Sequence, residues 1–357
     1  MRHRETKAIR TAMGSMIFRD TPFILMILFF AAACFLSLTA ESAAAPETAS
    51  GDSSRAGQQT YRISDTLEYS FVKPGKFDFI TNVPASLVAH GKSYGEKRNL
   101  PILAAVLAST AALVAVDPQF ITNSRSLAQD LGISDHGYQT NISPYPKFGM
   151  YMPGDVGTSL YFIGDGFVDL AIDASFLTYG LVKDDNRALQ TSSQIAEGLA
   201  VVLFYNQLMK KSFGRESPSR ATARGGVWRL FHDPRETFSD VPKYDAMPSG
   251  HMASTMLTLT VIADNYPEYT FIRPLGYTLM TALGFQMMNN RVHWISDYPL
   301  GLFIGYNVAK HVTKKGRTIR ELGAPGNAAK PGLWKRMVIT PAMYENYGAG
   351  FRSSITF

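Results

Sequence analysis

The sequence has a single cysteine, Cys34, and few charged residues for its length. One cysteine excludes a disulfide framework within the chain, and the lack of a CxxC or Cys/His cluster argues against a structural zinc site. Mean hydropathy is −0.04, which argues against a chain made mostly of transmembrane helix. Apolar residues make up 46% of the 357 residues, which predicts a folded chain of one large domain or two smaller ones. The net charge of +6 is compatible with anionic partners, including phosphorylated substrates and membrane surfaces.

Long uncharged runs are few, and the clearest one lies near the N-terminus. Residues 1–20 carry five basic side chains, and Thr21–Ala40 carries no charge. Small residues follow, with Ala-x-Ala-like sites after Ala40 and near Ala44, which predicts a cleaved secretory signal. Because about 20 apolar residues also span a bilayer, an uncleaved membrane anchor is the alternative. Both interpretations treat residues 1–45 as signal or anchor. They place the rest outside the cytoplasm, exported across the inner membrane and periplasmic or membrane-associated.

The rest of the chain shows helical periodicity and little strand alternation. Residues 46–98 are expected to form a linker and an irregular extension with a short strand at 67–72, and residues 135–158 a loop rich in Gly and Pro. The fold class is expected to be all-α, a helical bundle over 99–315 with a C-terminal extension over 316–357. The predicted helices cover residues 100–116, 159–181, 187–210, 251–265, 272–290 and 298–313. Their uncharged runs of about 12 to 17 residues are short for bilayer spans, and a polytopic protein with weak spans is the alternative.

The segment before the helix at 251–265 reads Pro248-Ser249-Gly250-His251. Ser249 is a good N-cap, so the helix should begin near Gly250. The unpaired N–H groups and positive dipole end of a helix N-terminus suit a phosphate, and His251 in the first turn would lie beside it. The alternative is an ordinary turn and cap with an incidental histidine.

Two other segments carry groups that can act on a phosphate. In one, His293 and Asp297 would share a helix face, and a carboxylate beside an imidazole fixes the tautomer and stabilises the imidazolium. Such a histidine is a better nucleophile or base. In the other, Lys210, Lys211 and Arg215 place three cations within six residues, which can hold a phosphate. The alternatives are a local helix-capping pair and an ordinary basic helix C-terminus.

In their order along the chain, these segments resemble the motifs of the type-2 phosphatidic-acid phosphatase superfamily over residues 187–312. The family pattern is Lys-x6-Arg-Pro, then Pro-Ser-Gly-His, then Ser-Arg-x5-His-x3-Asp. The resemblance implies a helical bundle of the bacterial acid phosphatase and vanadium haloperoxidase type that hydrolyses phosphate esters or diphosphates. The matching positions are Lys210 and Pro218 in the first motif, Ser249, Gly250 and His251 in the second, and His293 and Asp297 in the third.

Two arginines that contact phosphate in the family are missing here. Ser217 stands before Pro218, and Gln286-Met287 stands where the family has Ser-Arg. We hypothesise that Arg215 and Arg291 supply the missing charge. Arg291 is a candidate because it lies four residues after Met287, one turn on along the same helix face.

The resemblance implies a phosphohistidine mechanism. His293 attacks phosphorus, Asp297 orients and stabilises its ring, and His251 protonates the leaving oxygen and then activates water. Lys210, the arginines and the amides of Ser249–Gly250 stabilise the equatorial oxygens. The hypothesis is an exported phosphatase that requires no metal or other cofactor. Its substrate is a phosphorylated small molecule or lipid, and no nucleic acid is involved.

Three alternatives come with this interpretation. A catalytically degenerate protein that binds phosphate or a lipid headgroup on the same fold is favoured by Ser217 and Met287. A vanadate-dependent haloperoxidase would use the same site, and a membrane-embedded structural protein would carry the motifs by coincidence. Outside the motifs, the carboxylate stripe of Asp165, Asp169 and Asp173 is expected to be a solvated or salt-bridged face rather than a cation site.

Overall fold

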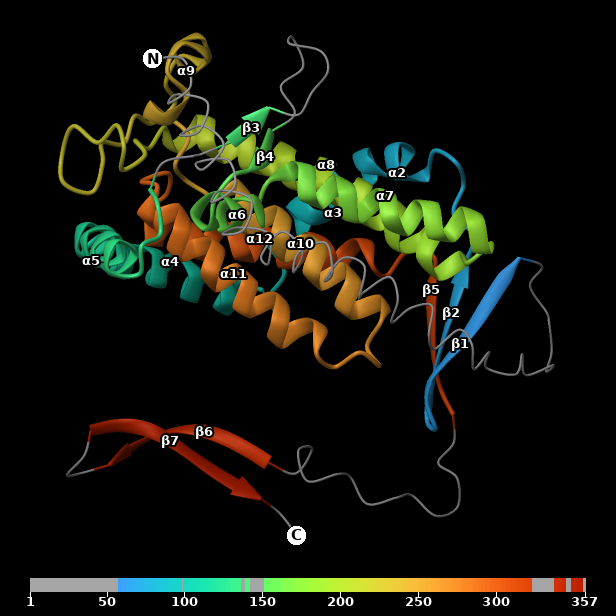
Figure 1. Cartoon of the computed structure of the whole chain (residues 1–357). Helices are drawn as coiled ribbons and strands as arrows, with labels where there is room; N and C mark the ends of the chain where they lie inside the picture. The colour runs from blue at the N-terminus through green and yellow to red at the C-terminus, as the bar shows by residue number, and fades with distance from the viewer. Residues whose placement is uncertain are drawn as a thin grey trace, which may run out of the picture.

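The structure is a computed structural model that describes residues 57–97, 99–135, 139–141, 151–322, 337–344 and 348–355. The expected signal or anchor over residues 1–45 lies outside these residues and stays a prediction. The described part is mostly helical, with a small sheet at one end of the bundle (Figure 1). The expectation of an all-α bundle is therefore confirmed for the core, and the sheet is an addition that the sequence did not predict apart from its strand at 67–72.

The helices pack around α8, α10 and α12. The α-helical bounds are α2 (Asp78–Thr81), α3 (Val83–Ser93), α4 (Leu100–Val114), α5 (Asp117–Asp130), α6 (Val156–Phe162), α7 (Gly166–Lys183), α8 (Asn186–Phe213), α9 (Pro234–Ser239), α10 (Gly250–Asn265), α11 (Ile272–Asn289) and α12 (Tyr298–Val312). Two short 3₁₀ helices are η2 (Val241–Lys243) and η3 (Ile295–Asp297). One apolar cluster joins the three central helices through side chains such as Ile195, Leu257 and Ile304, all fully buried.

Two glycines on α12 let its backbone touch that of α10. A Cβ on Gly305 would lie 2.1 Å from the carbonyl oxygen of Ala253, and one on Gly301 would lie 2.5 Å from that of Ser249. Neither position has room for a methyl group, because real Cβ contacts essentially never fall below 3.0 Å. This close approach fixes the first turn of α10 against the first turn of α12.

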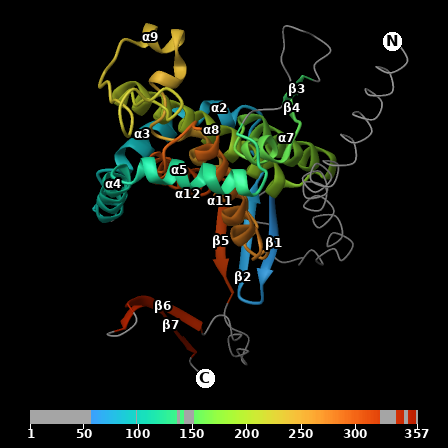
Figure 2. The ribbon, with the colours of Figure 1, turned by 60° about the vertical axis from the view of Figure 1, so that its left-hand side comes forward.

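The sheet lies at one end of this bundle (Figures 1 and 2). Its antiparallel strands have the order β1–β2–β5, and two separate hairpins complete the strands of the described residues. Asn186 at the start of α8 donates to the carbonyl of Gly57 over 2.9 Å, and Arg317 of β5 donates to the carbonyl of Asp264 near the end of α10 over 2.5 Å. The strand bounds are β1 (Gln58–Ser64), β2 (Leu67–Val72), β3 (Gln139–Asn141), β4 (Tyr151–Pro153), β5 (Arg317–Glu321), β6 (Met337–Tyr344) and β7 (Gly348–Ile355).

The structure corrects three expectations about local structure. The helix expected over 159–181 is broken into α6 and α7, because Asp165 caps α7 by accepting a hydrogen bond from the amide of Phe167 over 2.8 Å. Residues 58–93 form two strands and two helices rather than an irregular extension, and Phe71 of β2 is fully buried. Asp169, expected on a solvated or salt-bridged face, is buried and accepts a hydrogen bond from Thr258 of α10 over 2.7 Å.

None of the described helices is by itself both long and apolar enough to cross a bilayer. Helices α4 and α5, which meet at a bend of 69°, reach that length and composition when taken together.

Candidate active site

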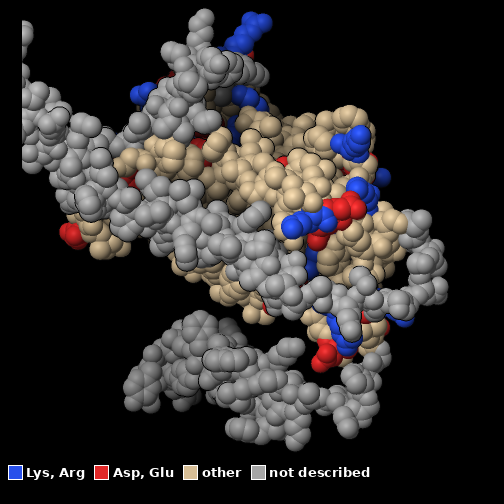
Figure 3. All heavy atoms as spheres, turned by 45° about the vertical axis from the view of Figure 1, so that its right-hand side comes forward, with Lys and Arg blue, Asp and Glu red and all other residues tan. Residues whose placement is uncertain are grey.

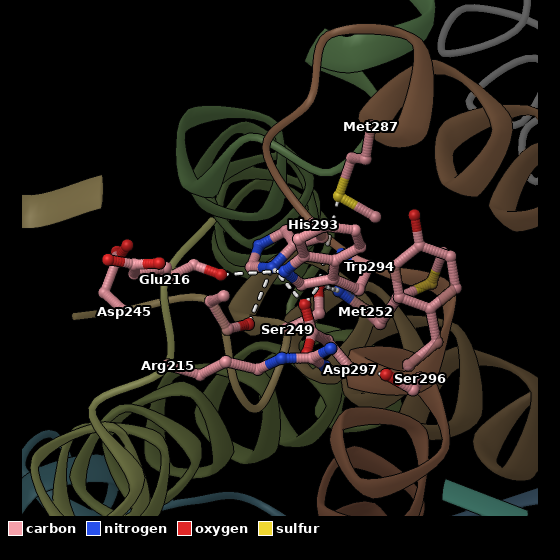
Figure 4. A network of polar contacts seen from close by, with 12 residues as sticks. Arg215, Glu216, Asp245, Ser249, Met252, Met287, His293, Trp294, Ser296 and Asp297 are labelled. Atoms are coloured by element: carbon pink, nitrogen blue, oxygen red, sulfur yellow. Dashed lines mark hydrogen bonds and ion pairs between the residues drawn. The ribbon is translucent and has the colours of Figure 1, made fainter. Parts of the chain in front are cut away.

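Three segments bring the predicted histidines together at the end of the bundle opposite the sheet. Lys210 lies in the last turn of α8, His251 in the first turn of α10, and His293 in the turn between α11 and η3. The rings of His251 and His293 have centroids 5.6 Å apart and are nearly perpendicular. The site therefore joins residues more than 80 positions apart in the sequence, and Figure 4 shows the surroundings of His293.

The N-terminus of α10 is built as the sequence predicted. Ser249 caps it, and its side chain accepts a hydrogen bond from the amide of Met252 over 3.4 Å. Gly250 follows at the first helical position, whose N–H has no partner within an α-helix. A Cβ built on Gly250 would lie 4.0 Å from Nζ of Lys210, so the ammonium group lies close to the first turn. A cation and a helix N-terminus together favour an anion.

The amide of Ser249 is not free, which corrects one expectation. It donates to the carbonyl oxygen of Asp297 over 3.0 Å, so it is already used within the protein. Ser249 contributes as a cap rather than as an amide donor to phosphate. This hydrogen bond also ties the second motif directly to the third.

His293 has one nitrogen committed and one available. Its Nδ1 lies 2.7 Å from the carbonyl oxygen of Ala246, and a carbonyl oxygen can only accept, so Nδ1 carries the hydrogen. Nε2 then holds the lone pair, as a nucleophile requires. Oδ2 of Asp297 lies 3.5 Å from Nδ1, so the carboxylate faces the ring but makes the longer contact. The predicted orienting role of Asp297 is thus shared with the Ala246 carbonyl, a backbone group that no sequence motif marks.

We expected His293 and Asp297 to share the face of one helix, and the structure does not place them on one α-helix. His293 precedes η3, and Asp297 ends it. Oδ2 of Asp297 accepts a hydrogen bond from the amide of Trp294 over 2.8 Å, which bends the turn back on itself. This turn presents both side chains to each other without a continuous helix.

Arg215 does not reach the phosphate position that we expected for it. Its side chain is fully buried, and its two terminal nitrogens are committed to carboxylates: Nη1 to Oδ1 of Asp297 and Nη2 to Oδ2 of Asp117, each over 2.6 Å. Figure 4 shows the guanidinium directed toward Asp297 and Ser296. The guanidinium is thus the counterion of the third-motif aspartate.

Arg291 also lies elsewhere than expected. Helix α11 ends at Asn289, and the amide of Asn290 closes it by donating to the carbonyl of Gln286. Arg291 lies beyond this end with a φ of 58° and is exposed. The expectation that it continues the helix face of Met287 is wrong, and a role in binding phosphate stays a prediction.

The two departures from the family pattern are buried in the structure. Met287 is fully buried, and its Sδ accepts a hydrogen bond from Oγ of Ser249 over 3.9 Å. Ser217 is 2% exposed, and its amide donates to the carbonyl of Pro242. Of the basic residues predicted for this site, the structure brings Lys210 to the histidines. Lys210 in turn faces Asp245, with Nζ and Oδ2 3.3 Å apart.

The electrostatics of the site keep both histidines neutral. Burial lowers the pKa of His251 to about 3, with His293 and Lys210 acting in the same direction. Burial and Lys210 likewise lower the pKa of His293 to about 3, although Asp245 opposes them. For Asp297, burial raises the pKa to about 7 against the opposing effect of Arg215. Neutral imidazoles at physiological pH leave a lone pair on Nε2 of His293.

Three residues in or behind the site were missed by sequence reasoning. The ring of Tyr161 packs 5.0 Å from that of His251, and Asp245 pairs with Lys210. Asp117 holds Arg215 from a helix that precedes every motif. A sequence signal for Asp245 did exist, because this carboxylate lies only four residues before Ser249 of the second motif. Among the described residues, no group of three or more His, Cys, Asp or Glu side chains is placed to hold a metal ion.

Among three comparisons with known proteins, the one with family models covers these motifs. No curated protein matches the chain. Among solved structures, it is similar to one titled as the crystal structure of the first transmembrane PAP2 type phosphatidylglycerolphosphate phosphatase from Bacillus subtilis. That similarity has 12% identity and a TM-score of 0.34, and it covers 67% of this chain and 95% of the other. The family model of the PAP2 superfamily matches residues 193–320, which include Lys210, His251, His293 and Asp297. Residues 193–320 of this chain thus belong to the PAP2 superfamily.

Proposed function

We propose that the protein is a phosphatase that hydrolyses phosphomonoesters or diphosphates through a phosphohistidine on His293. The observation that carries the proposal is the hydrogen bond from Nδ1 of His293 to the Ala246 carbonyl. It leaves Nε2 as the free nucleophilic atom, while the ring of His251 lies 5.6 Å away, between centroids. Membership of residues 193–320 in the PAP2 superfamily supports the same reaction class.

The reaction has two steps. Nε2 of His293 attacks phosphorus, the bond from phosphorus to the leaving oxygen breaks, and protonated His251 gives its proton to that oxygen. Neutral His251 then takes a proton from water, which attacks the phosphohistidine and releases phosphate. Lys210 and the free amides of the first turn of α10 stabilise the charge on the equatorial oxygens.

A proton on His251 is the demanding requirement of the first step. Burial and Lys210 disfavour the imidazolium, so the negative charge of the bound phosphate has to restore it. We therefore propose that turnover is faster in mild acid than above neutral pH. His293 tolerates acid, because its ring stays neutral until about pH 3.

The substrate class and the location belong to the same proposal. Exposed apolar side chains on α7 and α8, among them Leu177, Leu181 and Leu203, support contact with a lipid surface. Figure 3 shows wide parts of one side of the described surface without Lys, Arg, Asp or Glu. Together with the basic, apolar N-terminus, this favours an exported protein acting on a phosphorylated lipid or small molecule at a membrane face.

The test is phosphate release by the purified protein with EDTA present. Both p-nitrophenyl phosphate and a polyprenyl diphosphate are offered, and the preferred one decides between soluble and lipid substrates. His293→Ala should abolish turnover. His251→Ala should accumulate a phosphoenzyme from p-nitrophenyl phosphate, because this leaving group needs little help from an acid while the water step still needs a base. The matched control is His311→Ala. His311 lies in the last turn of α12, at the end of this helix that is farther from His293 in the sequence. Full activity in His293→Ala, or strict dependence on added metal, would overturn the mechanism.

A second candidate function is phosphate or headgroup binding without turnover. It is favoured by one observation, the burial of Ser217 and Met287 at the positions of the two family arginines, with Arg215 committed to carboxylates. Calorimetric binding of phosphate that depends on Lys210, in a folded protein that releases no phosphate from either substrate, would establish this alternative.

A further inference from the structure

A fully buried network joins the start of α5 to the turn that carries Asp297. Asp117, the first residue of α5, is completely buried. Its Oδ1 accepts the amide of Ser296 over 3.0 Å, and its Oδ2 accepts both Oγ of Ser296 and Nη2 of Arg215 over 2.6 Å. Asp117 lies outside residues 193–320, so it belongs to no motif of the matched segment.

Arg215 passes this contact on to Asp297. Its Nη1 donates to Oδ1 of Asp297 and to Oγ of Ser296, each over 2.6 Å (Figure 4). Its guanidinium carbon lies 4.7 Å from the ring centroid of Trp228 and 5.2 Å from that of Trp294, so aromatic faces help to fix it. Asp117 and the indoles thus hold the guanidinium in place.

Asp297 is the point where the network reaches both histidine segments. Its Oδ2 faces Nδ1 of His293 at 3.5 Å, and its carbonyl accepts the amide of Ser249, which caps the helix of His251. A shift of Asp297 would therefore move the ring of one histidine and the helix start of the other.

The charges of the network matter for the same reaction. When both carboxylates are ionised, they share one guanidinium and leave one negative charge in a region closed to water. When Nε2 of His293 binds phosphorus while Nδ1 keeps its hydrogen, the imidazole ring becomes positively charged. Burial raises the pKa of Asp297 to about 7, and the charged ring 3.5 Å away favours its ionised form. Because the guanidinium is shared with Asp117, it neutralises Asp297 only in part and leaves negative charge for that ring.

We infer that Asp117 is a positioning residue for the phosphorylation of His293, acting through Arg215 and Asp297. The inference rests on the proposed function. The other interpretation is a buried ion pair without a role in the reaction. Such pairs often add little net stability, although removing one partner is strongly destabilising.

The test compares Asp117→Asn with a matched buried pair. The asparagine keeps the size of the side chain and removes its charge. We expect the rate of phosphoenzyme formation to fall roughly tenfold, while KM changes little. A tenfold change corresponds to weakening the interaction between Asp297 and the charged ring by an amount equal to about one pKa unit. The control is Glu197→Gln, which removes the charge of a 1% exposed carboxylate paired with Lys315 over 2.5 Å. It should lose stability and keep wild-type phosphorylation below its melting temperature.

Two readouts separate the outcomes. The first is the phosphorylation rate, and the second is the NMR signal of the His293 Nδ1–H, which should shift in Asp117→Asn and not in Glu197→Gln. Wild-type phosphorylation in a folded Asp117→Asn, with an unshifted signal, overturns the inference. No turnover in any protein, with the signal shifted in Asp117→Asn alone, overturns the proposed function and keeps Asp117 as a positioning residue for the ring.

Discussion

We predict that Asp245 limits how tightly the candidate site binds an anion. Its carboxylate lies 3.3 Å from the ammonium group of Lys210, the cation that the structure brings to the histidines. A phosphate in the site has to compete with this carboxylate for Lys210 and is repelled by it. Asp245→Asn removes the charge, keeps the shape, and should therefore tighten the binding of phosphate and of vanadate.

The size of the effect follows from distance and exposure. Two unit charges about 4 Å apart interact by about 4 kcal/mol at an effective dielectric constant near 20. The side chain of Lys210 is 12% exposed and that of Asp245 is 30% exposed, so water screens the pair and much of that energy is lost. We take about 1.4 kcal/mol as the net change, which corresponds to a tenfold lower dissociation constant.

Inhibition of turnover by vanadate measures the change, and calorimetry with phosphate measures it when turnover is too slow. Asp240→Asn is the matched control. This substitution removes the same charge from the same loop. The partner of Asp240 is Arg220, whose side chain is 59% exposed and which belongs to none of the three motifs. An unchanged or weaker affinity in Asp245→Asn would refute the view that this carboxylate competes with the ligand, and would instead make it a group that orients Lys210.

Two further predictions concern stability. The folded-state pKa values of His251 and His293, lowered by burial to about 3, lie below the value of about 6.5 in an unfolded chain. Below pH 6.5 the unfolded chain binds protons at these positions that the folded chain does not, so the contribution of the two rings to the free energy of unfolding should fall toward pH 3, by at most about 1.4 kcal/mol per pH unit for each ring. Burial raises the pKa of Asp297 to about 7, which acts in the opposite direction, so the contribution of the rings is measured against a His251→Gln/His293→Gln variant. The same change in urea midpoint between about pH 7.5 and about pH 4.5 in both proteins would contradict this. Gly305→Ala should destabilise the fold by about 1–3 kcal/mol, because its methyl group meets the backbone of α10, whereas Gly166→Ala, whose Cβ meets nothing within 4 Å, should not. Thermal unfolding of both variants checks the difference.

The sequence predicted what depends on local signals. Ser249 as an N-cap, the helix from Gly250 and the pairing of His293 with Asp297 are marked by residue type and short spacing. The strand at 67–72 was also predicted and is β2. These features follow from hydrogen-bonding capacity and periodicity, which the sequence carries within a few positions.

The sequence did not predict contacts made across the fold. The Ala246 carbonyl that fixes the tautomer of His293 is a backbone atom, and any residue could provide it. Arg215 was expected to bind phosphate because it stands two residues before Ser217. In the structure its side chain is buried and pairs with Asp117. Strand β5 pairs with β2, about 250 positions earlier, and such pairing leaves no trace in local alternation.

The sheet at the end of the bundle also determines where the rest of the chain is attached. Gly57 precedes β1 and Leu322 follows β5, so residues 1–56 and 323–357 both join the helical core through this sheet. The histidines lie at the other end of α10, a helix of 16 residues and therefore about 24 Å long. The points where both segments join the core are therefore separated from the candidate catalytic histidines by about the length of that helix.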